Sequence, residues 1–514
     1  MVLDRRRFLV DLARNAALSA VVPNAFRVVW RPRFTDDPFQ LGVASGDPTP
    51  TGGVLWTRLA PSPLQPDFGM DGAKVVVSWE IADDDGFTRI VKQGRATAAP
   101  ELGYSIHVDV DGLAPDRWYF YRFRSGLEAS PVGRLRTSPP ESARTPLKFA
   151  FASCQHWEQG LYTAYDHMSR ENLDLIAHLG DYIYESISPN PVRKHATPEP
   201  MDLAGYRARY SQYRTDPALR AAHALCPWLI IWDDHEVDNN YAGLAGELGM
   251  ESEEQMRTRR AAAYQAWWEN QPVRVPRAKS WADLTIMRTV DWGGLARIFL
   301  LDGRQYRSDQ ACDDGDRVVP CGDWDDPKRT MLGPAQERWL SDGLARSKSH
   351  WQVLANQVML APFDSMNGPK RQLSMDKWAG YPAATNRLLD AIATHAPNRT
   401  VVVTGDIHSN WVNEIRTDFL KPERAPIAAE FVGTSVSSGG DGTERYRLMT
   451  PATMSENPHI KWQNSRRGYV SCTVDGDAWT AEYRTVAYVS KPGAPVETPT
   501  KWRVEHGRPG ILPS

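Results

Sequence analysis

The sequence lacks any long hydrophobic run, and no stretch approaches the roughly 18 to 20 apolar residues that span a membrane. It also has little excess charge of either sign: 60 Lys and Arg stand against 63 Asp and Glu, for a formal net charge of −3. A chain so balanced offers no broadly basic surface for nucleic acid. We therefore expect small partners, no stable nucleic-acid partner and no transmembrane anchor.

Cysteine is scarce as well. Five cysteines in 514 residues are compatible with an exported protein but do not form a dense disulfide framework. Cys312 and Cys321 bracket the short loop "CDDGDRVVPC" and could close it as a disulfide. Cys226 and Cys472 are typical of ordinary buried thiols. Cys154 has a different setting, at the end of an apolar run.

The N-terminal segment, residues 1–30, resembles a twin-arginine export signal. Arg5, Arg6, Phe8 and Leu9 carry that resemblance, and a weakly apolar, alanine-rich segment follows them. The alternative interpretation is a basic amphipathic helix. A signal of this kind implies recognition by the twin-arginine translocation machinery and a periplasmic or secreted protein. The cleavage site stays open, because no clean small-x-small triplet follows at the expected distance.

The remainder of the chain, which shows neither internal repeats nor low-complexity segments, changes character near residue 140. Residues 40–137 contain short alternating runs separated by Gly, Pro and Asp, the pattern of a small antiparallel β-sandwich. The stretch "RTSPPESARTP" then interrupts all periodicity. A chain of 514 residues is long enough for two or more domains. We predict a β-sandwich domain over residues 38–138 and an α/β domain over residues 146–505.

In the second region, five apolar runs end in polar side chains. The runs are near-continuously aliphatic, as in strands that helices cover on both faces. Segments 160–172, 258–270 and 385–395 are expected to be such helices. Because the carboxyl ends of strands in an α/β sheet converge on one crevice, the terminal side chains should lie together. The runs end at Cys154, Asp181, residues 233–236, Asp302, and Asp406 with His408.

These side chains favour a metal site. Clustered carboxylates raise one another's pKa unless a cation neutralises them. Carboxylate and amide oxygens suit Ca²⁺, Mg²⁺ or Mn²⁺, whereas a thiolate and a phenolate beside a histidine favour Fe³⁺. Each residue alone has a simpler explanation: a strand-end Asp commonly caps a helix, a Cys is commonly a core thiol, and Asp302 commonly pairs with Arg304 or Arg307. Because all these side chains occur together, they predict a site that binds more than one kind of metal ion.

Four motifs then specify a family. "GDYIY", "WDDHEVDNNY", "LDGRQYR" and "TGDIHSNW" occur in this order after "GVASGDPTPTGGVLWTRL". Together they resemble the PhoD-type alkaline phosphatases and phosphodiesterases, over nearly the whole chain after the signal segment. The resemblance implies a calcineurin-like metallophosphoesterase of the α/β class, with a four-layer α/β/β/α sandwich behind a small β-sandwich domain. It also implies a metal-bound tyrosinate, as in purple acid phosphatases.

The resemblance implies Fe³⁺ and Ca²⁺ as cofactors, with Asp181 as the carboxylate that bridges them. The implied iron ligands are Cys154, Tyr184 and His408, together with Asp181. The implied calcium ligands are Asp406, Asp234 and Asn239, although which of Asp233, Asp234, Asp238 and Asn239 contacts metal stays open. His235 is the expected proton donor.

The implied function is that of an exported, metal-dependent alkaline phosphatase, which hydrolyses small phosphomonoesters and phosphodiesters by attack of a metal-bound hydroxide. One alternative is a phosphodiesterase or phospholipase D-like enzyme acting on teichoic acid, nucleic acid or phospholipid. Another is a non-catalytic protein that binds phosphate or a polymer. Arg304, Arg307 and the rim segment 193–195 could contact the phosphate, or could form a salt bridge to Asp302 and a solvated loop.

Overall fold

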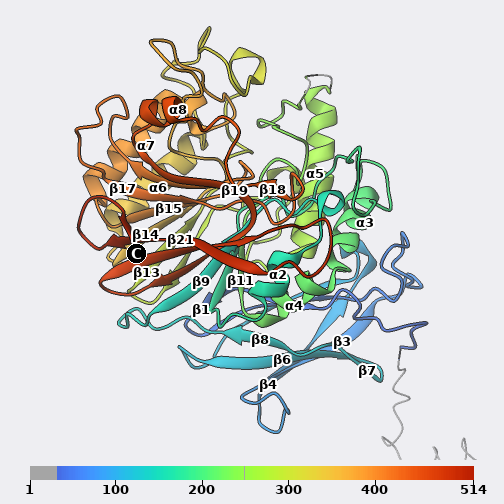
Figure 1. The fold of residues 1–514 in the computed structure, drawn as a ribbon. Coiled ribbons are helices and arrows are strands. Elements are labelled where there is room, and N and C mark those ends of the chain that lie inside the picture. Colours follow the sequence, from blue (N-terminus) through green and yellow to red (C-terminus); the bar gives the residue numbers. More distant parts are fainter. Residues whose placement is uncertain (1–31, 248, 250) are drawn as a thin grey trace, which may run out of the picture.

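The structure is a computed structural model that describes residues 32–247, 249 and 251–514 (Figure 1). The predicted export signal lies outside the described residues. Within the described part of the chain, no helix is both long and apolar enough to cross a bilayer.

The N-terminal region consists of two small antiparallel sheets packed face to face. Burial alternates along the strands of the second sheet, as expected when one face covers a core and the other faces solvent. This confirms the predicted β-rich N-terminal domain. The first sheet contains β1 (Val43–Thr49), β2 (Gly52–Arg58) and β5 (Ser105–Val110), and the second contains β3 (Val75–Ala82), β4 (Ile90–Ala98), β6 (Trp118–Ser125), β7 (Glu128–Ala129) and β8 (Gly133–Arg136).

The catalytic region contains two larger mixed sheets. In the first, β9, β10 and β11 are parallel, and in the second β13, β14, β15 and β17 are parallel. The first sheet is built from β9 (Leu147–Ala152), β10 (Leu175–His178), β11 (Trp228–Ile230), β19 (Ile460–Val474), β20 (Ala478–Val486), β21 (Val496–Glu505) and β22 (Leu512–Pro513). The second is built from β12 (Arg288–Trp292), β13 (Ala296–Leu300), β14 (Trp351–Ala355), β15 (Thr400–Thr404), β16 (Asn410–Ile415) and β17 (Ala428–Val432), and the short β18 (Gly442–Thr443) pairs with β19.

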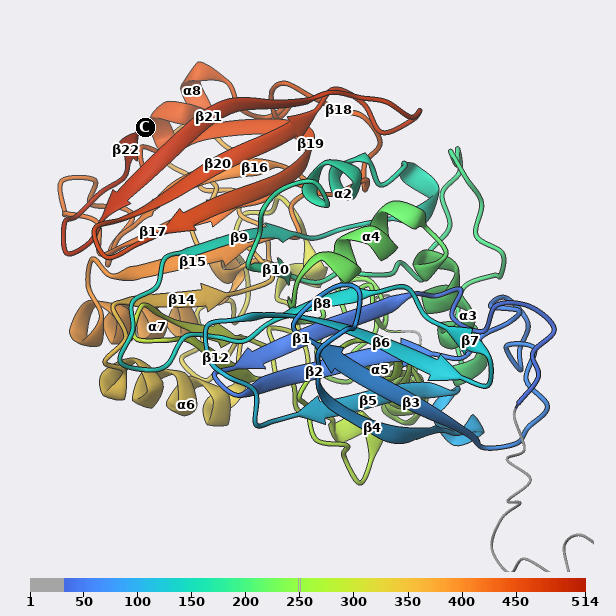
Figure 2. The ribbon, with the colours of Figure 1, turned by 90° about the horizontal axis from the view of Figure 1, so that it is seen from below.

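Helices cover the outer faces of the two sheets, which gives the expected four layers (Figures 1 and 2). Apolar side chains of α6 and α7 pack against β13, β14 and β15, while the largest apolar cluster lies between the sheets and extends under α2 to α5. The helices are α2 (Thr163–Met168), α3 (Leu203–Arg214), α4 (Pro217–Leu225), α5 (Glu253–Asn270), α6 (Gly333–Arg346), α7 (Pro382–His395) and α8 (Pro451–Glu456), with 3₁₀ turns at Pro100–Leu102, Trp157–Gln159, Trp281–Asp283, Cys312–Asp314 and Trp378–Gly380.

The three expected helices are present with shifted boundaries, and each shift has a local cause. α5 begins five residues before the expected segment 258–270, because Ser252 and Gln255 form a capping box there. α7 begins at Pro382, where the fixed φ of proline suits a first helical residue. The predicted segment 160–172 is helical only from Thr163 to Met168, since Gly160 is extended.

The long strand β19 joins the two catalytic sheets. Its first residues pair with β16 in the second sheet, and residues 470–474 pair with β9 in the first. β1 also pairs with β11, at Gly46 and Trp228, so the N-terminal sheet continues into the first catalytic sheet. The carboxyl ends of β9, β10, β11 and β15 therefore approach one another, and the expected polar side chains follow them.

Candidate metal centre

Four of the strand-end residues hold a backbone conformation that side chains usually avoid. Cys154, Asp181, Asp406 and His408 have φ values of 61°, 56°, 65° and 53°. For non-glycine residues this left-handed region costs on the order of 1–3 kcal/mol each, and such strain gathers at functional sites. Backbone bonds hold the turns: Cys154 N–H donates to Gly180 O at 3.2 Å. This backbone conformation directs the side chains of these short loops toward a common site.

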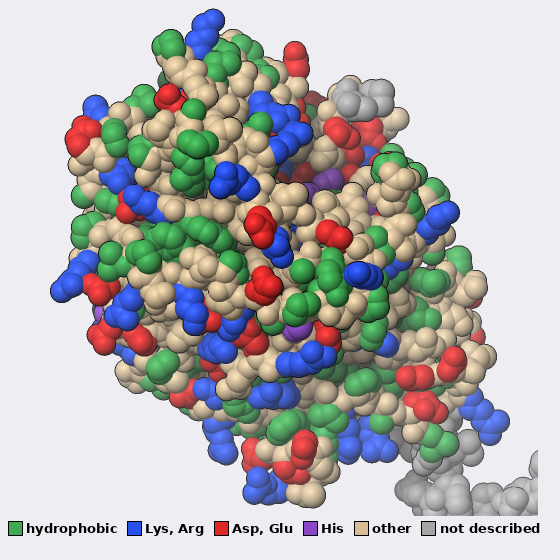
Figure 3. All heavy atoms as spheres, in the orientation of Figure 1, with side chains coloured by type: hydrophobic (Ala, Val, Ile, Leu, Met, Phe, Trp, Pro, Cys, Tyr) green, Lys and Arg blue, Asp and Glu red, His purple; other side chains and the backbone are tan. Residues whose placement is uncertain are grey.

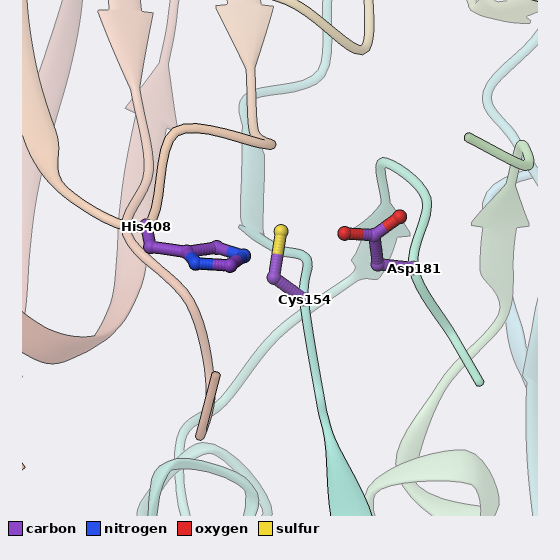
Figure 4. A group of neighbouring side chains, drawn as sticks. All are labelled: Cys154, Asp181 and His408. Atoms are coloured by element: carbon purple, nitrogen blue, oxygen red, sulfur yellow. The ribbon is translucent and has the colours of Figure 1, made fainter. Parts of the chain in front are cut away.

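One group joins a buried thiol, a buried carboxylate and a half-buried imidazole. Ligand atoms of Cys154, Asp181 and His408 all lie within 4.8 Å of one another, and Figure 4 shows the cysteine sulfur between the ring and the carboxylate. The Tyr184 hydroxyl donates to Asp181 Oδ2 at 2.7 Å and lies 3.1 Å from His408 Nε2. The four predicted iron ligands are therefore brought together.

Two further groups continue from this one. Asp181, Asp234 and His235 offer ligand atoms within 4.8 Å, and so do Asp233, Asp234 and Asp406. Asp181 belongs to the first two groups and Asp234 to the last two. The donors thus form one continuous chain, in which Asp181 faces both the thiol side and the carboxylate side.

The buried carboxylates fit bound cations. Asp181 Oδ1 and Asp233 Oδ2 have no hydrogen-bond partner within the described part of the chain, and a buried unpaired carboxylate oxygen is costly. Burial, with neighbouring carboxylates adding to it, raises the pKa of Asp181 and of Asp233. A metal ion would satisfy both the unpaired oxygens and the crowded charges.

The other donors of the first group also fit a metal. Burial first, and Asp181 second, raise the pKa values of the Cys154 thiol and the Tyr184 phenol. A strongly charged cation would be needed to hold either group as an anion. Burial lowers the pKa of His408, which keeps its imidazole neutral and able to act as a ligand.

Glu236 connects the loops that carry the carboxylates by hydrogen bonds. Its side chain accepts the backbone N–H groups of Asp181 at 3.0 Å, Tyr182 at 2.6 Å and Asp233 at 2.8 Å. Gly180 lies between these loops with a φ of 111°, and a Cβ there would stand 2.4 Å from Asp233 Cβ. The two strand-end turns therefore approach too closely for any larger residue.

Two cationic side chains, Arg304 and Lys377, balance part of the negative charge. Arg304 is fully buried and pairs with Asp376 at 2.6 Å, with Asp234 at 3.4 Å and with Asp406 at 3.5 Å. It also donates to Asp233. Lys377 pairs with Asp406. Asp376 and Lys377 had no sequence signal, because they lie in the irregular segment 356–377 rather than directly after a strand.

The expected pairing of Arg304 with Asp302 is wrong. The Asp302 carboxylate instead accepts the backbone N–H groups of Arg304 and Gln305, so it stabilises the turn after β13. Arg307 pairs with Asp376 at 2.9 Å rather than with Asp302. Both arginines share Asp376 as a partner, and Arg304 also contacts carboxylates of the donor groups, because the Asp302 carboxylate is already engaged by the backbone of its own turn.

His235 has a carboxylate partner, Glu185, that the sequence reasoning also missed. His235 Nδ1 lies 2.8 Å from Glu185 Oε2, and its ring is centred 4.0 Å from the Tyr184 ring. Burial lowers the pKa of His235, but Glu185 and Asp234 outweigh it and raise that pKa above the ordinary value. The position of Glu185, directly after Tyr184 in "GDYIYES", was the available signal.

Other candidates contact residues outside the three donor groups. The Asn239 amide donates to Glu247, and its backbone N–H donates to Glu185. Asp238 pairs with Arg259 at 3.0 Å. In the rim segment, Arg193 pairs with Asp216 at 2.6 Å.

The remaining cysteines behave as expected. Cys312 and Cys321 are bonded to each other, and Cys226 and Cys472 are buried free thiols.

Comparisons with known proteins place the site in context. The model of the PhoD-like phosphatase matches residues 149–483, and that of the PhoD-like phosphatase N-terminal domain matches residues 24–139. Alkaline phosphatase D from Bacillus subtilis is 45% identical over 521 residues, covering 99% of this chain and 88% of the relative.

Solved structures agree. A structure of PhoD has a TM-score of 0.91 and 45% identity, covering 94% of this chain and 93% of its own. A purple acid phosphatase from yellow lupin seeds shares the fold, with a TM-score of 0.56 and 14% identity over 91% of this chain and 74% of its own.

Proposed function

Because the chain belongs to the PhoD-like phosphatase family and is a metal-dependent phosphoric ester hydrolase, we propose that it hydrolyses both phosphomonoesters and phosphodiesters at alkaline pH. The observation that carries the proposal is the continuous chain of donors, in which Asp181 faces a thiol, a phenol and an imidazole on one side and further carboxylates on the other.

We propose Fe³⁺ and Ca²⁺ as the metals. The iron would be held by Cys154, Tyr184, His408 and Asp181, and the calcium by Asp181, Asp234, Asp406 and Asn239. When bound, the metals would polarise the phosphoryl oxygens and supply a nucleophile from water at neutral to alkaline pH. The soft thiol and the phenol suit iron, whereas the carboxylate oxygens suit calcium.

The protein side chains have separate tasks in this proposal. Asp181 keeps the two halves of the site together, and Arg304 fixes the direction of Asp233 and Asp234 through its ion pair and hydrogen bond. His235 gives a proton to the departing ester oxygen. Glu185 and Asp234 raise the pKa of His235, which favours the protonated form that the step requires, and Glu185 orients the ring.

The metals and the substrate classes can be tested together. Purified protein should contain iron and calcium, turn over an aryl monophosphate and its bis-aryl diester, and show a visible absorption band that Tyr184→Phe shifts or abolishes. Asp181→Asn should lose at least one metal and several orders of magnitude in rate while its fold persists. A colourless, fully active enzyme containing only zinc would contradict the metal assignment, and activity confined to diesters would favour the polymer- or lipid-cleaving alternative.

We further propose export by the twin-arginine route, with a signal over residues 1–30, a β-sandwich domain over 38–138 and a catalytic domain over 146–505. Replacing Arg5 and Arg6 by Lys should leave active protein in the cytoplasm, because that route depends on the arginine pair. Normal secretion of the double variant would contradict the proposal.

A further inference from the structure

A small cavity of about 210 Å³ opens beside the metal-site residues. Asp406, Ile407, His408 and Lys377 line one side of it. Figure 3 shows one hollowed face of the molecule, with histidine side chains visible inside the depression. Because Asp406 and His408 belong both to the donor groups and to the cavity wall, whatever fills the cavity lies directly next to a phosphoryl group at the site.

Another part of the cavity lining is apolar and partly aromatic. It is formed by Met359, Ala361, Phe363, Tyr446 and Leu448. Phe363 and Tyr446 are only partly buried, although both pack against a hydrophobic cluster below them. A large apolar wall that remains accessible next to a polar reaction site is characteristic of ligand-binding pockets.

The aromatic wall is held rigidly. Phe363 and Tyr446 contact the fully buried Trp411, with ring centroids at 5.2 Å and 5.4 Å, and each other at 5.9 Å. The indole N–H of Trp411 donates to Ser409 Oγ at 2.7 Å, one residue beyond His408. The wall is therefore fixed to the same loop that carries the histidine, so its position relative to the metal site is preset.

We propose that this cavity is a subsite for one aromatic substituent of the substrate, attached at or next to the phosphorus. This deepens the proposed function and rests on it. The cavity is smaller than the roughly 300 to 1,000 Å³ of drug-sized sites, so it admits a single ring rather than a polymer segment. Edge and face contacts with Phe363 and Tyr446 favour a ring over an alkyl group of similar size.

The charges around the cavity favour a substrate whose phosphoryl group lies at the donor groups and whose ring lies in the cavity. Lys377 stands at the metal-site end of the cavity, and Arg317 and Asp316 at another part of its lining. An anionic phosphoryl group with one apolar substituent therefore finds its polar part at the donors and its ring against the aromatic wall.

The test uses phosphonates, which bind like the substrate but are not hydrolysed. Inhibition constants for phenylphosphonate, methylphosphonate and inorganic phosphate are measured on the metal-loaded full-length protein. We expect phenylphosphonate to bind at least about tenfold tighter than methylphosphonate, the usual gain from an apolar pocket. Phe363→Ala and Tyr446→Ala should each remove most of that ratio, whereas Tyr446→Phe, which keeps the ring, should retain it.

Two controls keep the outcomes distinct. Phe419→Ala changes a partly buried aromatic residue that lines a different cavity, and it should leave the ratio unchanged. Inhibition by inorganic phosphate should stay constant in every variant, which shows that the metal site is intact. An unchanged phenyl-to-methyl ratio in both alanine variants, with phosphate inhibition and melting temperature like wild type, overturns the subsite. Absence of any phosphoester turnover by the wild type would instead overturn the proposed function.

Discussion

Four residues of the candidate site hold backbone conformations that most non-glycine residues avoid. Cys154, Asp181, Asp406 and His408 all sit in the left-handed region directly after parallel strands. Glu236 holds two of the loops by their backbone N–H groups, so the strain is offset by bonds that leave the functional side chains free. The donors are thus preorganised by the backbone rather than by one another.

Glu185 should act as a positioning residue for His235. Glu185→Gln keeps the size of the side chain but removes the charge that orients the imidazole and raises its pKa. We expect kcat to fall about 10- to 100-fold for alkyl esters, whose leaving oxygen needs a proton, and much less for 4-nitrophenyl esters. The alkaline limb of the pH profile should also move to lower pH. An equal loss for both ester classes, with an unshifted profile, would contradict this role.

His178 should make the fold sensitive to acid. It is fully buried in β10, and burial lowers its pKa to about 3. Because the unfolded chain binds the proton more readily, the stability contributed by the neutral ring is complete above pH 6.5 and is lost as the pH falls toward 3. At pH 5 the free energy of unfolding should be about 2 kcal/mol lower than at pH 8 because of this histidine.

The comparison of wild type with His178→Phe isolates that contribution. The melting temperature should fall less from pH 8 to pH 5 in the variant than in the wild type, because phenylalanine does not bind a proton. Parallel decreases in the two proteins would show that other groups cause the acid sensitivity.

Among the elements, the loop closed by Cys312 and Cys321 lies close to the reaction site. Val318 forms a β-bridge with Leu373, and Gly315 O accepts the N–H of Met375 at 2.9 Å. Of the next residues, Asp376 pairs with Arg304, and Lys377 pairs with Asp406. The disulfide therefore restrains the segment that carries the charge-balancing side chains.

Replacing Cys312 and Cys321 together by Ser should test that restraint. For a loop of this length we expect a loss of about 2–3 kcal/mol in the free energy of unfolding, measured in urea. We also expect KM to rise with a smaller change in kcat, because Lys377 becomes less well positioned while the strand-end donors stay in place. Unchanged stability and KM in the double variant would show that the other contacts of the loop hold the segment in place without the disulfide.

At the scale of the whole molecule, a buried ion-pair network ties the N-terminal sheets to the catalytic region. Glu269, at the end of α5, pairs with Arg58 of β2 at 3.3 Å and with Arg207 of α3 at 2.6 Å. Arg58 and Glu269 are fully buried, and burial lowers the pKa of Arg58 to about 10. Removing one partner of such a pair leaves an uncompensated buried charge.

Glu269→Gln should therefore lower the free energy of unfolding by about 3–5 kcal/mol, as measured in urea. Glu80→Gln is the matched control, because its pair with Arg122 is partly exposed and worth about 0–1 kcal/mol. Metal content and kcat at low temperature should stay near wild type in both variants, since neither residue reaches the site. A loss of metal in Glu269→Gln without a loss of stability would contradict a purely architectural role.

Sequence patterns alone were enough to predict the classes of structure and several residues that the fold brings together. Alternating runs predicted the N-terminal sheets, and aliphatic runs ending in Cys154, Asp181, Asp406 and His408 predicted strands with ligands at their carboxyl ends. Such signals are local, because burial of one face or both faces of a strand is encoded in consecutive residues.

The partners of these residues could not be predicted from the sequence, because they come from distant parts of the chain. Arg304 pairs with Asp376, 72 residues away, rather than with neighbouring Asp302, and β19 joins both catalytic sheets although nothing in its sequence marks the change. His235 likewise meets Glu185 from a different loop, 50 residues away. An ion pair depends on the charges of all the loops that surround it. These loops come together only after the sheets have packed, so the pair cannot be predicted from neighbouring residues.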